Sequence, residues 1–324
     1  MANVNEAQVK RVADLLKKAE MGSGLNFYSI KKGDTEIVLA DMYPPLNHPQ
    51  VVNYLFFMTA HDFGFWYGDN AGYLEPLYGT IGGKRLKGSD LLWKSCMRRF
   101  SEDASMFQPE RFADITPETF AKMFSDDNGP VPFPDLEARF MLTRAYGMWF
   151  RKYGQSPKMI LQNAHDAKNP LLRFLDATSC IPGYDADSYL KKNRLLAMAL
   201  HRRPEHFLAV TDHEHWKPIV DYHLMRVSLR LGLIDVAQAE RNQLRLRAWC
   251  SSNMEAGIRK ATFDAVSMLA ELSGQSMFAI DEALWMARKY CPEIEQPDCA
   301  KCLFNAACEK RTELFQPVLR TTAY

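Results

Sequence analysis

The chain has 324 residues, of which 47% are hydrophobic and 24% charged, and its formal net charge at pH 7 is +1. This composition is typical of a globular protein with one large or two ordinary domains. No apolar run reaches the roughly 18 residues of a transmembrane helix, so no membrane contact is expected. The balanced charge argues against avid duplex binding, because proteins that neutralise many phosphates usually carry a basic surplus. The polar start lacks the apolar core of a secretory signal, which predicts a cytoplasmic protein.

The spacing of apolar residues predicts a mostly helical chain with one small β-hairpin. The hairpin is expected over residues 26–39, where two β-prone runs flank Lys32-Gly33-Asp34. The Gly-rich run 79–84 lacks Walker-A spacing and is interpreted as a turn. The break at 126–130, rich in Asp, Asn, Gly and Pro, predicts a boundary between two lobes. Helices are expected over residues 5–20, 50–60, 135–175 and 236–290, with further helix starts at Ser89 and Thr116.

An aromatic segment, residues 61–70, fits neither a helical stripe nor a strand alternation. Aromatic rings can hold a planar heterocycle by stacking, while nearby polar groups read the edge of that heterocycle. The segment therefore predicts a base pocket, and an ordinary aromatic corner of the core is the alternative. The candidate residues are Phe65, Trp66, Asp69, His61 and Asp62.

The segment 181–188 joins two expected helices and carries two acidic residues, Asp185 and Asp187. Two carboxylates at such a turn would repel a phosphate, which argues against DNA binding there. Lys191 and Lys192 open the following helix, and we interpret them as solvated surface residues.

Asp221 stands at an expected helix start. Pro218 prevents a helix from entering from upstream, and Gly232 provides a left-handed stop after the apolar stripe. Unpaired N–H groups and the macrodipole favour an ionised carboxylate at this position. By itself this pattern indicates an N-cap; Tyr222, the next residue, is a further candidate for substrate contact.

Four of the seven cysteines crowd near the C-terminus, with seven, two and five residues between them. An odd total with one crowded group favours a metal site in a reducing compartment over a disulfide framework. Residue type alone leaves an iron–sulfur cluster and structural zinc open, because both accept thiolates. The isolated Cys96, Cys180 and Cys250 are expected to be small buried hydrophobes. The predicted ligands are Cys291, Cys299, Cys302 and Cys308.

Two segments resemble helix-hairpin-helix glycosylases such as endonuclease III. Val220-Asp221, His223 and Arg226-Val227 match that family's Val-Asp-x-His-x-x-Arg-Val segment, in which Asp221 takes the place of the family aspartate. The four cysteines resemble the family's C-x6-C-x2-C-x5-C loop, with one extra residue in the first interval. This resemblance implies a [4Fe–4S] cluster, with structural zinc as the alternative.

The N-terminal part resembles the queuosine salvage proteins, which release the modified base queuine from its nucleotide. That family carries a similar Phe-x-Phe-Trp followed by an acidic residue, matched here by residues 63–66 and Asp69. The segments 107–124 and 136–139 fit its pattern more loosely. Since that family is itself related to helix-hairpin-helix glycosylases, both resemblances imply one architecture.

The implied fold is mostly α: a two-lobed, helix-hairpin-helix glycosylase-like fold with a small N-terminal β-hairpin and a C-terminal iron–sulfur cluster loop. The expected domains are an N-terminal lobe over 1–130, a helix-hairpin-helix-like lobe with Asp221 over 131–248, and C-terminal helices with the cluster loop over 249–324.

The implied function is hydrolysis of the N-glycosidic bond of a modified purine-like nucleoside or nucleotide, which is the expected small-molecule partner. The Asp221 carboxylate would stabilise an oxocarbenium-like sugar and position water. One alternative is a DNA base-excision glycosylase, which would need base flipping. A second alternative is a non-catalytic nucleic-acid-binding module.

Overall fold

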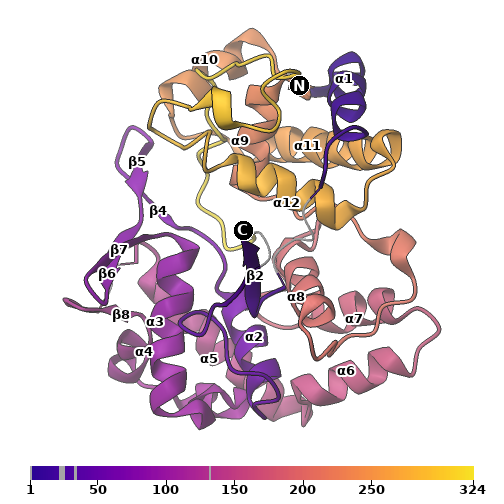
Figure 1. Cartoon of the computed structure of the whole chain (residues 1–324). Coiled ribbons are helices and arrows are strands. Elements are labelled where there is room, and N and C mark those ends of the chain that lie inside the picture. The colour runs from indigo at the N-terminus through magenta and orange to yellow at the C-terminus, as the bar shows by residue number, and fades with distance from the viewer. Residues whose placement is uncertain (1, 22–25, 33–34, 131–132) are drawn as a thin grey trace. The chain divides into compact units, whose positions relative to one another are not determined.

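The computed structural model describes every residue except 1, 22–25, 33–34 and 131–132. The described chain is mostly helical, as the sequence predicted (Figure 1). Its strands form several small separate two-stranded sheets, whereas the sequence predicted one hairpin. None of the helices described is long and apolar enough to cross a membrane. The residues group into two compact units, of which unit 1 comprises Met1–Gly24, Tyr67–Glu75 and Lys217–Arg320, and unit 2 comprises Leu25–Trp66, Pro76–Trp216 and Thr321–Tyr324.

Unit 1 joins the beginning of the chain to its last third. The first helix, α1, has Asn5 as its N-cap and packs a fully buried stripe of Val9, Val12, Ala13 and Leu16 against α11. Strand β1 pairs with β10 antiparallel, with Val4 opposite Ile234. Its elements are β1 (Asn3–Val4), α1 (Glu6–Leu16), α9 (Tyr222–Leu231), β10 (Ile234–Asp235), α10 (Gln238–Leu246), α11 (Ser252–Ser273), α12 (Met277–Ala287) and the short η4 (Cys299–Lys301).

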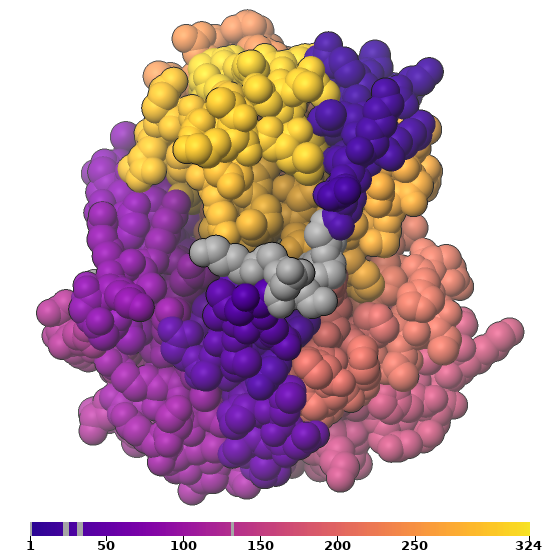
Figure 2. Space-filling view, in the orientation of Figure 1, coloured from indigo at the N-terminus to yellow at the C-terminus, as the bar shows by residue number. Residues whose placement is uncertain are grey.

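The Gln8 side chain fixes α1 to the rest of unit 1. Its amide group donates hydrogen bonds to Leu231 O at 2.6 Å and to Ala307 O at 2.7 Å. Figure 2 shows the C-terminal segment, in yellow, beside the indigo α1 on the visible face. The three predicted consecutive domains do not include this association of the two ends of the chain.

Unit 2 is built around α2, whose residues from Tyr54 to Met58 are fully buried, and which packs on α3, α6 and α8. Strands β4 (Trp66–Gly68) and β5 (Tyr73–Pro76) pair where the chain changes from one unit to the other. The remaining elements are β2 (Ser29–Lys32), β3 (Thr35–Val38), α2 (Val51–Ala60), β6 (Tyr78–Ile81), β7 (Lys84–Lys87), α3 (Ser89–Glu102), η1 (Ala104–Phe107), η2 (Pro109–Asp114), α4 (Pro117–Met123), β8 (Ser125–Asp126), β9 (Gly129–Pro130), α5 (Leu136–Tyr153), α6 (Pro157–His165), α7 (Pro170–Thr178), α8 (Lys191–Arg202) and η3 (His213–His215).

Both predicted short connections form hairpins. Strands β2 and β3 pair from Ser29 and Val38 inward, while the predicted turn at 33–34 lies outside the described residues. Gly82 and Gly83, with φ of +59° and +71°, make the turn between β6 and β7. Glycine suits this turn because it tolerates positive φ at both positions.

The acidic break at 126–130 lies inside unit 2 rather than between the units. Its residues form the β8–β9 hairpin, and its carboxylates bind the neighbouring β6–β7 hairpin. Asp126 accepts a hydrogen bond from Thr80 N at 2.9 Å, and Asp127 accepts one from Gly83 N at 3.0 Å. The polar residues of this segment therefore satisfy the backbone of another element instead of forming a linker.

The isolated cysteines differ from the expectation. Cys96 is buried as predicted, but Cys250 is half-buried and Cys180 is exposed. Burial was predicted from residue type alone, and Cys180 lies in the turn after α7, where no apolar face covers it.

Candidate functional site

Asp221 is the N-cap of α9, as the sequence predicted (Figure 1). Its Oδ1 accepts a hydrogen bond from Leu224 N at 2.9 Å, and Gly232 ends the helix with a φ of +83°. The guanidinium of Arg259, from α11, donates to Val220 O at 3.1 and 3.3 Å. These contacts fix the start of α9, so the half-buried Asp221 carboxylate has a defined position beside the positive end of the helix dipole.

The interior face of α9 carries a buried polar network. The Arg226 guanidinium donates to Gln316 Oε1 at 2.8 Å and lies 3.9 Å from Glu293 Oε1. The other terminal nitrogen of Arg226 is 3.1 Å from His223 Nδ1. The Glu293 side chain is buried, with 1% of its surface exposed. Arg226 is therefore a buried cation with a carboxylate near it, which is the arrangement that makes burial of a charge tolerable.

The turn between α7 and α8 contains two carboxylates that accept hydrogen bonds from nearby backbone N–H groups. Gly183 N donates to Asp185 Oδ1 at 3.3 Å, and the Asp187 carboxylate accepts from Tyr189 N at 3.0 Å and from Lys191 N at 2.7 Å. In helix-hairpin-helix DNA glycosylases such backbone donors face a phosphate. Here the Asp185 and Asp187 carboxylates of the chain itself accept the hydrogen bonds of these N–H groups. The helix–turn–helix order is as expected, and the helix-hairpin-helix family fold stays a prediction.

The aromatic segment after α2 is part of the core of unit 2. Phe65 and Trp66 are only 6% and 5% exposed. The buried Arg139 of α5 lies 4.0 Å from the Phe63 ring centroid and 5.4 Å from that of Phe65, and it donates to His61 O at 2.7 Å. A guanidinium stacked on these rings takes the place that a planar ligand was expected to take.

Lys191 and Lys192 are buried, which corrects the prediction of a solvated surface role. Lys191 forms an ion pair with the Asp62 carboxylate and donates to Asp62 O at 2.9 Å. Lys192 donates to Ala60 O at 3.0 Å and lies 5.0 Å from the Phe63 ring centroid. The sequence alone did not reveal this burial, because the acceptors belong to a loop more than a hundred residues earlier.

Burial, together with the charges of Lys191 and Arg139, lowers the pKa of Lys192 to about 7. Both protonation states of this amine are therefore populated at neutral pH. A buried group whose pKa lies near the working pH is suited to proton transfer, although structural charge clusters also shift pKa values in this way.

His61 is fully buried beside these cations. Burial, then Arg139 and Lys192, lower the pKa of His61 well below its usual value, so the imidazole is neutral at pH 7. Thr143 donates its hydroxyl proton to Arg139 O at 2.8 Å and lies 3.0 Å from His61 Nε2, which makes Nε2 the protonated nitrogen. Among the described residues no group bonds to His61 Nδ1, which is then a free acceptor.

The structure brings together some of the predicted site residues and not others. His61, Asp62, Phe65 and Trp66 share unit 2 with Lys191, Lys192 and Arg139, which the sequence reasoning did not select. Asp69 belongs to unit 1 with Asp221 and Tyr222. Its carboxylate accepts from Ala71 N at 2.8 Å and Gly72 N at 3.1 Å, so it closes its own turn. Tyr222 is 5% exposed, with its ring centroid 4.3 Å from that of His223.

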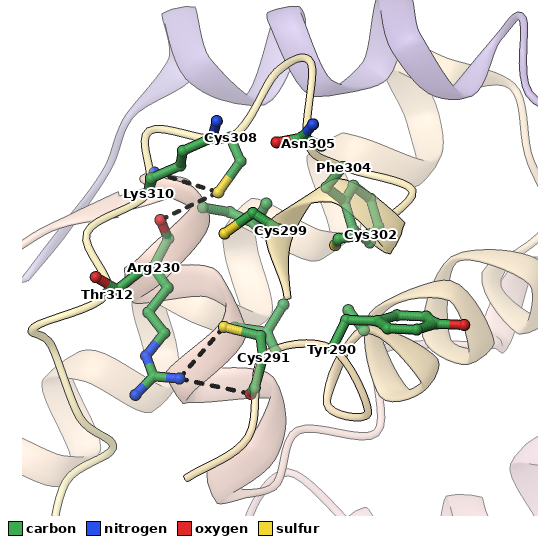
Figure 3. A pocket seen from close by; sticks show the side chains of 13 residues that line it. Arg230, Tyr290, Cys291, Cys299, Cys302, Phe304, Asn305, Cys308, Lys310 and Thr312 are labelled. Atoms are coloured by element: carbon green, nitrogen blue, oxygen red, sulfur yellow. Dashed lines mark hydrogen bonds between the residues drawn. The ribbon is translucent and has the colours of Figure 1, made fainter. Parts of the chain in front are cut away.

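The four predicted cysteine ligands, all from residues 291–308, line one pocket of unit 1 (Figure 3). The pocket contains about 420 Å³ of space, including solvent at its mouth. Burial raises the pKa values of the Cys302 and Cys308 thiols, and the other cysteines of the pocket add to the increase. Within the described part of the chain, no group of three or more His, Cys, Asp or Glu side chains is arranged to hold a metal ion.

Arg230, from the last turn of α9, borders this cysteine pocket. Its Nη1 donates to Cys291 Sγ at 3.2 Å and to Pro292 O at 2.6 Å, while its Nε donates to Leu314 O at 2.8 Å. Lys310 N donates to Cys308 Sγ at 3.2 Å. Two of the four sulfurs thus accept hydrogen bonds from N–H groups (Figure 3).

The model of the family described as queuosine salvage protein matches residues 42–295. This range contains Asp221, the Asp62–Lys191 pair and Cys291, and it ends before Cys299. A search among curated proteins finds no match.

Proposed function

Because the chain belongs to the queuosine salvage protein family, we propose that it hydrolyses the N-glycosidic bond of a queuosine-like nucleoside or its 5′-monophosphate. The reaction releases the modified base and leaves the sugar with a hydroxyl at its anomeric carbon. The observation that carries this proposal is the family match over residues 42–295. The resemblance to endonuclease III stays a prediction.

We assign the reacting carboxylate to Asp221. As the C–N bond lengthens, positive charge develops on the sugar, and an ionised carboxylate beside the anomeric carbon stabilises it. The same carboxylate orients the attacking water and accepts its proton, while the base leaves with the bonding electron pair and takes up a proton. Support for this assignment comes from the N-cap hydrogen bond from Leu224 N, because it fixes the position of the Asp221 carboxylate at the start of α9.

Base recognition by His61, Asp62, Asp69, Tyr222, Phe65 and Trp66 stays a prediction; Asp69 and Tyr222 belong to unit 1, and the other four residues belong to unit 2. Rings that are 5–6% exposed have little face left for stacking, so Phe65 and Trp66 would shape the site rather than cover the base. His61 has an acceptor at Nδ1, but its side chain is fully buried, so we expect it to shape the site from within the core of unit 2.

A small nucleotide is favoured over a DNA duplex as the substrate. The formal charge of +1 gives little general attraction to a polyanion, and Asp185 and Asp187 occupy the donors of the α7–α8 turn. We therefore expect no base release from a damaged duplex, and the following experiment would detect such release.

The test is incubation of the wild type and Asp221→Asn with queuosine 5′-monophosphate, queuosine and a damaged duplex, with chromatographic detection of free base. Asparagine keeps an N-cap acceptor for Leu224 N but removes the charge, so the fold should persist while turnover of the nucleotide falls about 100-fold or more. Asp103→Asn is the matched control, because Asp103 caps η1 and is exposed. Near wild-type turnover by Asp221→Asn would contradict the assignment, and release from the duplex alone would contradict the substrate class.

A further inference from the structure

The cysteine pocket carries chemistry that the proposed hydrolysis does not use. Three of its four cysteines lie beyond residue 295, where the family match ends. We propose that Arg230 is the buried cation that balances the thiolate charge of the [4Fe–4S] cluster that the resemblance to endonuclease III implies for this pocket.

The first argument is the charge of Arg230. This residue is 5% exposed, and a buried guanidinium needs a nearby negative charge to offset the cost of leaving water. Among the residues that the structure describes, its hydrogen-bond acceptors are backbone carbonyls and the Cys291 sulfur, with no carboxylate. The negative charge must therefore come from the sulfur side of the pocket, and a metal-bound thiolate supplies it.

Two other buried arginines show the usual arrangement. Arg203 lies 2.9 Å from Glu205 Oε1, and Arg226 lies 3.9 Å from Glu293 Oε1. Both are 0–1% exposed, so burial alone does not explain the different surroundings of Arg230. Arg230 differs from them in facing cysteine sulfur where they face a carboxylate.

The second argument concerns the sulfurs themselves. Arg230 Nη1 and Lys310 N each donate to a cysteine sulfur at 3.2 Å. N–H groups aimed at sulfur stabilise thiolates and tune the potential of iron–sulfur clusters. The Cys308 sulfur also lies 3.5 Å from Arg230 O, and as a protonated thiol it can donate a hydrogen bond to this carbonyl. Binding of the sulfur to iron would replace this hydrogen bond with an iron–sulfur bond.

The arrangement of the sulfurs favours a cluster over a single zinc ion. Zinc binds four sulfurs at about 2.3 Å, so its ligands must converge on one point. In the described residues no three candidate side chains do so, although four cysteines line the same pocket. A [4Fe–4S] cluster binds each cysteine through a different iron, so its four sulfur ligands do not have to converge on one atom. Figure 3 shows the sulfurs of Cys291, Cys299 and Cys308 turned toward this common space.

The test begins with protein expressed in iron-supplemented medium and purified without oxygen. We expect a brown protein with about four iron and four acid-labile sulfide per chain. Cys299→Ser should lose most of both, while Cys180→Ser, which changes an exposed cysteine outside the pocket, should keep them. Three results would each overturn the proposal. They are stoichiometric zinc in the purified protein, disulfide-bonded cysteines that do not react with thiol reagents, and a wild type that contains neither iron nor sulfide.

The role of Arg230 has its own readout, the reduction potential of the cluster. Loss of a positive charge makes electron uptake less favourable, so Arg230→Met should shift the potential to more negative values and speed the loss of iron in air. Arg230→Lys should restore much of both. Arg203→Met removes a buried arginine in unit 2 and controls for destabilisation alone: iron loss as fast as in Arg230→Met would overturn the role of Arg230. A cluster-loaded protein that does not hydrolyse the nucleotide counts against the proposed function only.

Discussion

Buried positive charge occurs in both units, but it is balanced in two different ways. In unit 2 the Lys191 ammonium pairs with the Asp62 carboxylate, so the chain supplies both members of the pair. In unit 1 the Arg230 guanidinium faces carbonyl oxygens and cysteine sulfur. The comparison teaches that a buried cation with its own carboxylate is a complete structural unit. A buried lysine without one can release its proton, as the lowered pKa of Lys192 indicates, whereas a buried guanidinium stays charged and indicates a ligand. The following predictions test this distinction.

The largest effect is expected when the complete pair is broken. Asp62→Asn leaves the Lys191 ammonium buried without its countercharge, and we expect a loss of about 3–5 kcal/mol in the free energy of unfolding. Urea denaturation followed by circular dichroism measures it. The control is Asp114→Asn, which removes the exposed partner of Arg151 and should cost less than about 1 kcal/mol. Equal effects of the two variants would show that the buried pair has no special role.

A comparable effect, spread over several pH units, is expected from the pH dependence of Lys192. Its pKa is about 7 in the folded chain against a usual 10.5, so the unfolded chain binds more protons between these values. Stability should therefore rise with pH from about 7 toward 10.5, by up to about 1.4 kcal/mol per pH unit, and this contribution should be constant below pH 7.

Lys192→Met removes the titrating amine. The difference in unfolding free energy between this variant and the wild type, measured from pH 6 to 10, isolates the contribution of Lys192 from those of other groups. The groups close to it are Lys191, Arg139, Asp62 and Asp187. A difference that stays constant across this range would mean that Lys192 keeps its usual pKa.

The smallest effect depends on the state of the cysteine pocket. With the cluster bound, Arg230→Met should lower the free energy of unfolding by about 2 kcal/mol, since it removes hydrogen bonds to charged sulfur. In iron-free protein the same change should be neutral or stabilising, because an unbalanced buried cation is lost. Paired urea denaturation of loaded and chelator-treated protein separates the two cases. An identical cost in both would make Arg230 a purely structural residue.

Local sequence signals predicted the helices well. Asn5, Thr116 and Asp221 are N-caps whose side chains bond to the first helical turn, and Gly232 is the expected left-handed stop. These signals act within a few residues, so they can be read from the sequence directly. The position of Asp221 at a helix start was predictable for the same reason, whereas its catalytic role depends on the family.

Long-range features were not predictable in this way. The burial of Lys191 and Lys192 depends on carbonyls of a loop more than a hundred residues away, and lysine is rarely buried. The grouping of α1 with the C-terminal third depends on the pairing of β1 with β10, which no local pattern encodes. The spacing of the four cysteines did predict that they come together, since they are close in sequence.

The composition of unit 1 has a consequence for the order of events during synthesis. Residues 1–24 leave the ribosome well before α11, the helix that covers the apolar stripe of α1. Until then Val9, Val12 and Leu16 have no native cover, and the acceptors of the Gln8 amide, Leu231 O and Ala307 O, do not yet exist. The closing of unit 1 therefore waits for the synthesis of residues 217–320. A nascent chain that stalls before residue 217 exposes the apolar face of α1 to chaperones or to aggregation.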